Sequence, residues 1–262
     1  MNPDYIHQAA QILLERRQSG RQGDALPAAL RPDNLDTAFA IQCQVSKLIS
    51  QPIAAWKCGL PAHDAPDAPY KWVVAPIFGY DVHDTGTQIC AVWARDGQIK
   101  IEPELAFILA HDLPARVAPY APADVEAAVA ETRLALELID SRYTDAEQLN
   151  FHDHFADGLF NQGLLLGPIV DPQLAEQTSQ LSITLSIAGQ TDITLHGQHP
   201  ADQPRLPLYW LAEFLRSKGL GLQAGQAVIT GSYAGSPSVH VGADIQVQFG
   251  ELGLIRTRFE GK

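Results

Sequence analysis

Cysteine is scarce in this chain of 262 residues, which contains only Cys43, Cys58 and Cys90. The three are widely spaced, no two of them form a CxxC pair, and their number is odd. The sequence therefore predicts neither a disulfide framework nor a thiolate zinc site. A reducing compartment suits such a chain, and we expect a cytoplasmic protein.

Basic residues are also few, because 18 Lys and Arg stand against 30 Asp and Glu, for a formal net charge of −12. Such a chain repels phosphate backbones and anionic lipids, so we expect neither a nucleic-acid partner nor membrane binding. The longest apolar runs, such as residues 105–110, are far shorter than the roughly 20 residues that span a bilayer. The opening residues indicate an amphipathic helix rather than a signal peptide, and we expect a soluble protein.

The pattern of apolar residues changes along the chain. Helical spacing appears over residues 4–19 and 34–50, whereas residues 52–79 hold short apolar runs broken by prolines, with a long surface loop or mobile lid expected over residues 61–70. Strand-like runs dominate residues 80–262, interrupted by helices expected over residues 122–131 and 206–219. We therefore predict an α+β fold with a mixed sheet, in which residues 1–79 form a helical and lid region and residues 80–262 a β-rich catalytic domain.

The clearest local signal is the segment Ile-Glu-Pro-Glu-Leu at residues 101–105. In an extended strand, residues two apart point to the same side, so Glu102 and Glu104 would face one spot. An ExE segment is usually a solvated strand face. Here, however, the flanking runs are apolar, and two like charges on a buried face repel each other unless a cation neutralises them.

A third carboxylate, Glu137, lies inside the apolar run at residues 134–139. It could form a buried ion pair with Arg142 or Arg133, or it could join the first two glutamates as a metal ligand. Three carboxylates suit a hard ion such as Mg²⁺ or Mn²⁺, which leaves positions open for water and an oxygen-rich substrate. A small 2-oxo acid fits, because its carboxylate and keto oxygens can chelate together.

Two further segments are candidates for contact with the substrate. Lys57 lies among apolar and small residues; it is either a surface lysine or a buried proton carrier whose pKa cannot be assigned from sequence. The glycine-rich residues 230–236 follow a strand, and Gly231 and Ser232 could present polar groups to a substrate carboxylate, although most such segments are simple turns.

Other motifs give little support for alternative chemistries. The pairs His152/His154 and His196/His199 lack the spacing of a helical zinc site, so we expect surface or loop histidines. The sequence contains no GxSxG, P-loop or GxGxxG motif, and this disfavours serine hydrolases, NTPases and dinucleotide-binding enzymes.

Taken together and in order, the segments IEPELAFIL, LELIDSR, FADG, VITGS and VQFGELG resemble the hydratase/decarboxylase branch of the fumarylacetoacetate hydrolase superfamily. The resemblance covers nearly the whole chain, from WKCGL onward. It implies a mixed β-sheet roll with a smaller, mainly helical N-terminal domain, assembled into homo-oligomers. It also implies a place in aromatic meta-cleavage catabolism, with a possible partner enzyme from that pathway.

The same resemblance implies roles for single residues. Glu102, Glu104 and Glu137 would be the metal ligands, Lys57 the lysine near the substrate, and Asp157 the catalytic acidic residue of the Ala-Asp segment. The chain departs from the usual Ala-Asp-Asn-x-Ser of hydratases at Gly158 and Phe160, and Pro61 replaces a small hydroxyl residue. These changes remove polar groups that discriminate between substrates, which puts the usual substrate in doubt.

We expect a metal-dependent hydratase of a small unsaturated 2-oxo acid such as 2-hydroxypenta-2,4-dienoate. The alternative is decarboxylation of 2-oxo-3-hexenedioate (4-oxalocrotonate), which proceeds through a similar enolate and would need an extra cationic pocket for the second carboxylate. Hydrolysis of an acylpyruvate-like substrate would need a general base such as His63 or His83. A non-catalytic relative that keeps the metal for stability is the alternative from another class.

Overall fold

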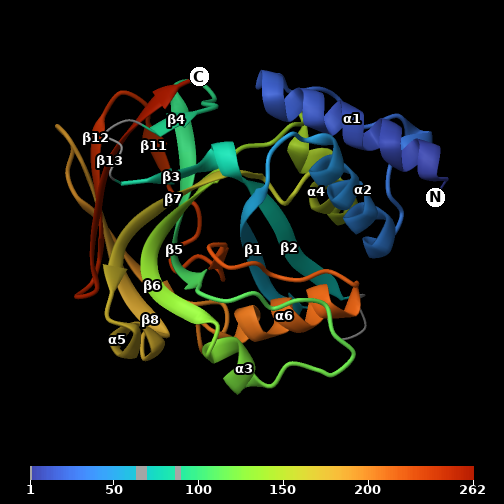
Figure 1. The fold of residues 1–262 in the computed structure, drawn as a ribbon. Coiled ribbons are helices and arrows are strands. Elements are labelled where there is room, and N and C mark those ends of the chain that lie inside the picture. Colours follow the sequence, from blue (N-terminus) through green and yellow to red (C-terminus); the bar gives the residue numbers. More distant parts are fainter. Residues whose placement is uncertain (1, 63–69, 86–89) are drawn as a thin grey trace.

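The computed structural model describes residues 2–62, 70–85 and 90–262. Two curled β-sheets form its centre, with helices α1, α2 and α4 at one end and α6 and α3 below the larger sheet (Figure 1). The larger sheet is mixed, so the predicted α+β fold with N-terminal helices and a mixed sheet is confirmed.

Side chains cap the two long N-terminal helices. Asn2 accepts a hydrogen bond from the backbone N–H of Asp4, and Asn34 accepts one from Thr37, which satisfies N–H groups that have no partner within their helices. The α-helices are α1 (Pro3–Ser19), α2 (Leu35–Leu48), α3 (Pro122–Glu126), α4 (Phe151–Ala156), α5 (Pro172–Glu176) and α6 (Leu206–Ser217). Short 3₁₀ turns are η1 (Ala28–Leu30), η2 (Gly79–Asp81) and η3 (Ala146–Gln148).

The larger sheet has eight strands in the order β2-β1-β10-β5-β6-β7-β3, with β11 also paired to β5. The pairs β1 with β10 and β3 with β7 are parallel, and the others are antiparallel. Its strands are β1 (Ile53–Ala62), β2 (Lys71–Phe78), β3 (Val82–Asp84), β5 (Gln98–Leu109), β6 (Val129–Ile139), β7 (Asn161–Val170), β10 (Ala227–Ile229) and β11 (Ser238–His240).

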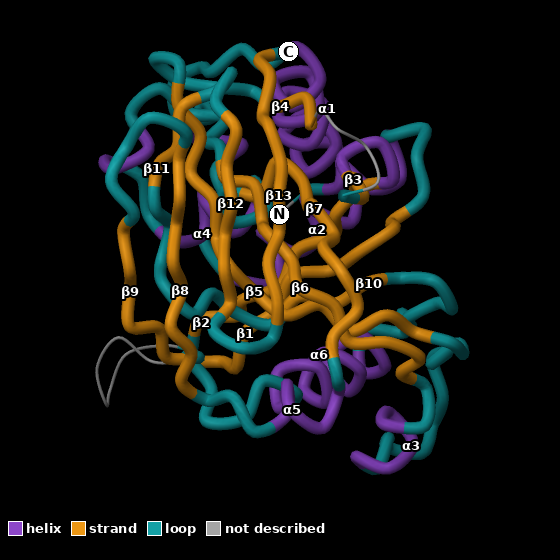
Figure 2. The backbone as a smooth tube through the Cα atoms, turned by 90° about the vertical axis from the view of Figure 1, so that its left-hand side faces the viewer, coloured by secondary structure: helices purple, strands orange, loops and turns teal. Residues whose placement is uncertain are grey.

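The smaller sheet covers one side of the larger one (Figure 2). Gly167 of β7 permits close contact with it, because a Cβ at this position would lie 2.6 Å from Cγ1 of Ile255. Apolar side chains from both sheets share one large core that includes Leu134, Ile255 and Phe259. The strand order of the smaller sheet is β4 (Cys90–Val92), β13 (Gly253–Gly261), β12 (Asp244–Phe249), β8 (Gln180–Ile187) and β9 (Ile193–Gln198).

The short apolar runs of residues 52–79 were not predicted to be strands, but β1 and β2 occupy most of this range. Pro76 lies inside β2, but β2 is an edge strand, where a missing N–H is tolerated. Most of the expected lid, residues 63–69, lies outside the described residues. The division of the chain at residue 79 stays a prediction; β1 and β2 belong to the same sheet as β5, β6 and β7.

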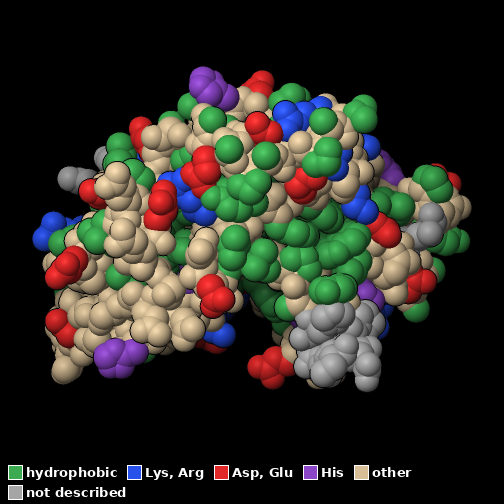
Figure 3. Space-filling model, turned by 90° about the horizontal axis from the view of Figure 1, so that it is seen from below, with side chains coloured by type: hydrophobic (Ala, Val, Ile, Leu, Met, Phe, Trp, Pro, Cys, Tyr) green, Lys and Arg blue, Asp and Glu red, His purple; other side chains and the backbone are tan. Residues whose placement is uncertain are grey.

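Two further observations concern the helices and the surface. The helix expected over residues 122–131 ends at Glu126, and strand β6 begins at Val129. None of the described helices is long and apolar enough to cross a membrane. On the face shown in Figure 3, the basic side chains of the described residues are scattered among acidic ones, so this face presents no continuous basic patch.

Candidate metal and substrate site

The structure brings Glu102, Glu104 and Glu137 together. Glu102 and Glu104 project from one face of β5, and Glu137 lies directly opposite Glu102 on β6. One carboxylate oxygen from each residue lies within 4.8 Å of the other two. Glu104 is 2% exposed and Glu137 fully buried, so this cluster concentrates negative charge where water cannot screen it.

A gap in the larger sheet shapes the cluster. Strands β10 and β11 both pair with β5, but they leave residues 101–105 between them, and the loop of residues 230–237 fills this stretch. The loop donates from Tyr233 N to the carbonyl oxygen of Pro103 at 3.0 Å and from Gly231 N to Oε2 of Glu104 at 2.6 Å. Pro103 fits inside β5 because no neighbouring strand needs an N–H at this point.

The predicted loop residues therefore lie at the site, and the Gly231 N–H and the Ser232 hydroxyl are engaged within the protein. The Gly231 N–H is used to orient Glu104, and the hydroxyl of Ser232 donates to the carbonyl oxygen of Gly235 at 2.7 Å. Gly231 has φ 130°, and a Cβ there would lie 2.5 Å from Cγ of Pro200, so this position requires glycine. A substrate-binding role for Gly231 and Ser232 stays a prediction.

Lys57 is the cation of the site. Its Nζ lies 2.7 Å from Oε1 of Glu137 and donates to the carbonyl oxygen of Leu159 at 3.1 Å. The sequence had suggested Arg142 or Arg133 as the ion-pair partner of Glu137. That was wrong, because these arginines bind Asp157 and Asp84 instead.

The direction of the Lys57 pKa follows from this geometry. Burial alone would lower the pKa, but the charges of Glu137 and Glu102 and the hydrogen bond to Glu137 outweigh it, and the pKa of Lys57 is raised. Lys57 is therefore an ammonium group at neutral pH, able to donate a proton or a hydrogen bond.

The pKa values of Glu102 and Glu104 are also raised, in this case above the ordinary value of a glutamate. Burial, followed by the charge of Glu137, raises the pKa of Glu102 to about 7. The same two causes, with the charge of Glu102, raise the pKa of Glu104 well above its usual range, although Lys57 and the Gly231 N–H oppose the shift. Without a bound cation, the cluster therefore holds protons that free glutamates would release.

This predicts how stability depends on pH in the metal-free protein. Between the ordinary value near 4.5 and about 7, folded Glu102 keeps a proton that the unfolded chain has lost, so its contribution to stability falls as pH rises through this window. Between pH 5 and 8, we expect the free energy of unfolding to fall by on the order of 1 kcal/mol less in Glu102→Gln than in the unaltered protein. Urea titrations in the presence of chelator measure this; equal slopes in both proteins would contradict it.

Sequence reasoning missed Asn161, the first residue of β7. It is fully buried, and its Nδ2 donates to Oε1 of Glu137 at 2.8 Å. Its own carbonyl oxygen accepts hydrogen bonds from Arg17 at 2.6 Å and Arg142 at 2.8 Å. A polar Asn-Gln pair at the start of an apolar run was the available signal.

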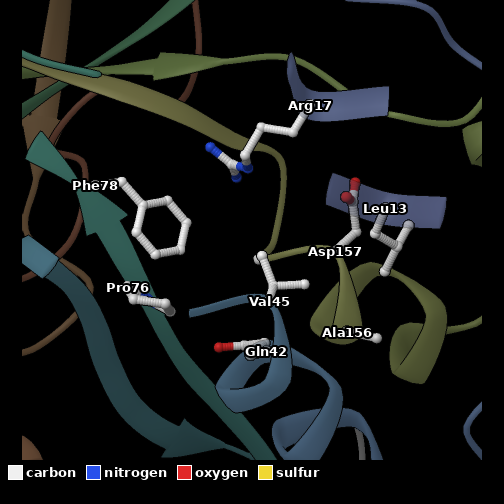
Figure 4. A pocket seen from close by; sticks show the side chains of 9 residues that line it. Leu13, Arg17, Gln42, Val45, Pro76, Phe78, Ala156 and Asp157 are labelled. Carbon is white, nitrogen blue, oxygen red and sulfur yellow. The ribbon is translucent and has the colours of Figure 1, made fainter. Parts of the chain in front are cut away.

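Asp157 lies at the end of α4, beside a small cavity of about 20 Å³ between α1, α2 and β2 (Figure 4). Its carboxylate accepts from Nε of Arg142 at 2.7 and 2.9 Å, and both side chains are buried. These contacts hold the residues that follow, Gly158, Leu159 and Phe160, whose φ values of 79°, 53° and 66° are all left-handed. A catalytic role for Asp157 stays a prediction; the contacts of its side chain support a structural one.

The contacts predict that Asp157→Asn destabilises the fold. Removing one partner of a buried ion pair leaves the charge of Arg142 uncompensated, which costs about 3 kcal/mol. Asp84→Asn is a matched control, because Asp84 pairs with Arg133 at a largely exposed position and its loss costs less than about 1 kcal/mol. Urea denaturation of both variants checks this. A stable Asp157→Asn protein with lost turnover would assign Asp157 to the reaction instead.

The histidines lie elsewhere. His199 lies in a loop, as expected, but it is buried, with Nδ1 2.8 Å from the carbonyl oxygen of Ala201. His83 lies on β3, the edge strand beyond β7, and its pKa is lowered by burial and by Lys262. His63 lies outside the described residues. Neither suggested general base is brought to the cluster within the described part of the chain.

The family model "Fumarylacetoacetate (FAA) hydrolase C-terminal" matches residues 56–260, which include every residue of the cluster. The chain belongs to the fumarylacetoacetate hydrolase family. This confirms the resemblance inferred from the sequence motifs.

Relatives place the chain in the hydratase/decarboxylase branch of this family. A 2-keto-4-pentenoate hydratase from Paraburkholderia xenovorans (strain LB400) is 26% identical over 272 residues, covering 99% of this chain and 97% of the relative. A 4-oxalocrotonate decarboxylase from Pseudomonas sp is 25% identical over 156 residues, 60% and 59% of the two chains. The crystal structure of 4-oxalocrotonate decarboxylase from Pseudomonas putida G7, complexed with magnesium and adipate, has a TM-score of 0.77 at 18% identity and 99% coverage of both chains.

Proposed function

We propose that this member of the fumarylacetoacetate hydrolase family is a divalent-metal-dependent hydratase of a small unsaturated 2-oxo acid such as 2-hydroxypenta-2,4-dienoate. The observation that carries the proposal is the convergence of three buried glutamates beside the Lys57 ammonium. Relatives that match nearly the whole chain, with 97% of their own length covered, are 2-keto-4-pentenoate hydratases, which supports this reaction class.

The residues present fit a Mg²⁺ or Mn²⁺ ion. The buried Oε2 of Glu137 has no hydrogen-bond partner among the described residues, and carboxylate oxygens are the ligands these ions prefer. Glu102, Glu104 and Glu137 would hold the ion. The magnesium in the structurally similar decarboxylase supports the same choice of metal. A divalent ion bound here would neutralise negative charge that develops on the 2-oxo oxygen of the substrate.

The chain's own groups orient the carboxylates of the cluster and supply a proton to the substrate. The amide of Asn161 and the N–H of Gly231 fix the Glu137 and Glu104 carboxylates, as supporting groups do around metal ligands. Lys57 holds a proton at Nζ and can deliver it to a carbon of the dienol during ketonisation, while the proton lost from the enol hydroxyl restores the ammonium form of Lys57. On the inner side, buried Ala106, Ala135 and Ile229 close the site against water.

Decarboxylation of 2-oxo-3-hexenedioate is the second candidate reaction. It would use the same cluster and the same proton donor, since both reactions pass through a negatively charged enolate. A pocket lined in part by Lys100 and Ile139 begins two residues along β5 and β6 from Glu102 and Glu137, and this favours the second candidate because the substrate carries a second carboxylate.

The test follows the ultraviolet absorbance of freshly generated 2-hydroxypenta-2,4-dienoate mixed with the protein, with Mg²⁺ present and again after chelation. Metal-dependent loss of the diene absorbance, with a hydrated 2-oxo acid as product, supports the hydratase. If the diene survives, 2-oxo-3-hexenedioate with detection of carbon dioxide tests the decarboxylase. Survival of both substrates would favour a non-catalytic, metal-binding relative.

A further inference from the structure

Exposure increases along the face of β5 that carries the glutamates, from Ala106 to Lys100. Lys100, Glu102, Glu104 and Ala106 alternate along β5 and therefore share one face of the sheet. Ala106 is fully buried, Glu104 nearly so, Glu102 half-buried and Lys100 exposed. Along this face, a substrate whose 2-oxo acid end is held by the glutamates can therefore extend toward Lys100.

The pocket that receives this extension has a volume of about 450 Å³. Its floor continues the register of the cluster, because Lys100 pairs with Ile139 of β6 and with Ser238 of β11, two residues beyond the pair Glu102 and Glu137. Two residues of a strand span roughly 6.6 Å, which an extended chain of about six carbons can bridge.

One wall of the pocket is aromatic. The rings of His154 and Phe160 lie 4.5 Å apart, centre to centre, and Phe160 is one of the three residues held at positive φ. Flat apolar surface of this kind packs well against a planar conjugated chain. The departure from the hydratase pattern at Phe160 thus falls in the wall beside the distal part of the substrate.

Arg95, Lys100, Asp140 and Glu147 are the Arg, Lys, Asp and Glu residues that line the pocket, and Lys100 is the cation that is not ion-paired among the described residues. Arg95 is neutralised by Asp140, which it binds through two hydrogen bonds of 2.6 and 2.8 Å, and His154 is kept uncharged by burial. Lys100 forms no ion pair with any residue in the described ranges 2–62, 70–85 and 90–262. Glu147, exposed at the rim, is the acidic group that opposes it.

We infer that this pocket binds the distal carboxylate of a dicarboxylic 2-oxo acid, and that Lys100 determines the preference for a diacid over a monoacid. The inference rests on the proposed function, since it takes the glutamate cluster as the site of the 2-oxo acid end. It holds for a hydratase and for a decarboxylase alike, because it concerns the far end of the substrate and not the bond that changes.

The experiment measures binding of adipate and of pentanoate to the Mg²⁺-loaded protein by calorimetry, and kcat/KM for six-carbon diacid and five-carbon monoacid dienol substrates. We expect adipate to bind at least about tenfold more tightly than pentanoate, and Lys100→Gln to remove that preference, as loss of a charge-assisted hydrogen bond does. Glu147→Gln should strengthen adipate binding severalfold. Lys47→Gln, which removes an exposed lysine from α2, is the matched control and should leave the ratio unchanged.

The outcomes separate the two claims. If Mg²⁺ binds and the monoacid is turned over, but Lys100→Gln keeps the wild-type ratio of adipate to pentanoate affinity, the distal-carboxylate pocket is refuted and the proposed function stands. The absence of any preference for the diacid in the unaltered protein refutes it equally. If no Mg²⁺ binds and neither substrate reacts, the proposed function fails, and the inference fails with it.

Discussion

Replacement of Glu104 is expected to abolish tight binding of Mg²⁺ or Mn²⁺ and to lower metal-dependent turnover at least about a hundredfold, since even supporting groups around metal ligands are worth ten- to a hundredfold. Glu104→Ala removes the carboxylate, whereas Glu104→Gln keeps its shape and can still accept the hydrogen bond from Gly231 N. Calorimetric titration of each variant with Mn²⁺ measures the loss directly.

The metal-free variants distinguish a ligand from a merely structural glutamate. Glu104 is buried beside the charges of Glu137 and Glu102, so Glu104→Gln removes repulsion and should raise the melting temperature in chelator. The same variant should lose the further stabilisation that metal gives the unaltered protein. Glu251→Ala, at an exposed position, is the control and should change neither quantity. Unchanged metal affinity in Glu104→Gln would remove Glu104 from the ligand set.

Much of the site could be predicted because its signals are local. The alternation of a strand places Glu102 and Glu104 on one face whatever the rest of the fold does. Glu137 stood out as a charge inside an apolar run, and a buried charge needs a partner. What sequence could not give was the register that puts Glu137 opposite Glu102, because strand pairing joins residues 35 positions apart.

The errors have physical causes of the same kind. Strands β1 and β2 were missed because their prolines indicated irregular structure, while the sheet places Pro76 on an edge where it is harmless. A nearby arginine was one of the two partners considered for Glu137, but Lys57 reaches it from a strand 80 residues earlier. Asn161 was missed because the polar Asn-Gln pair at the start of β7 does not indicate which carboxylate the amide meets.

Lys57 is the second residue whose loss should have a large effect. Lys57→Met removes both the proton carried at Nζ and the positive charge 2.7 Å from Glu137. General acid–base groups contribute about a hundred- to ten-thousandfold to rate, so kcat should fall by at least about a hundredfold. Metal affinity should be kept or raised, because a cation that repels the metal has been removed. Calorimetry and the diene assay on the same preparation measure both.

Lys57→Arg separates the proton from the charge. A guanidinium keeps the positive charge beside Glu137 but does not release a proton at neutral pH, so the Lys57→Arg variant should bind metal like the unaltered protein and yet fail to restore kcat. Lys47→Met controls for loss of a lysine at an exposed site of α2. If Lys57→Arg instead turns over the substrate at a near-normal rate, Lys57 acts as a charge that balances the glutamates, and the proton must come from solvent.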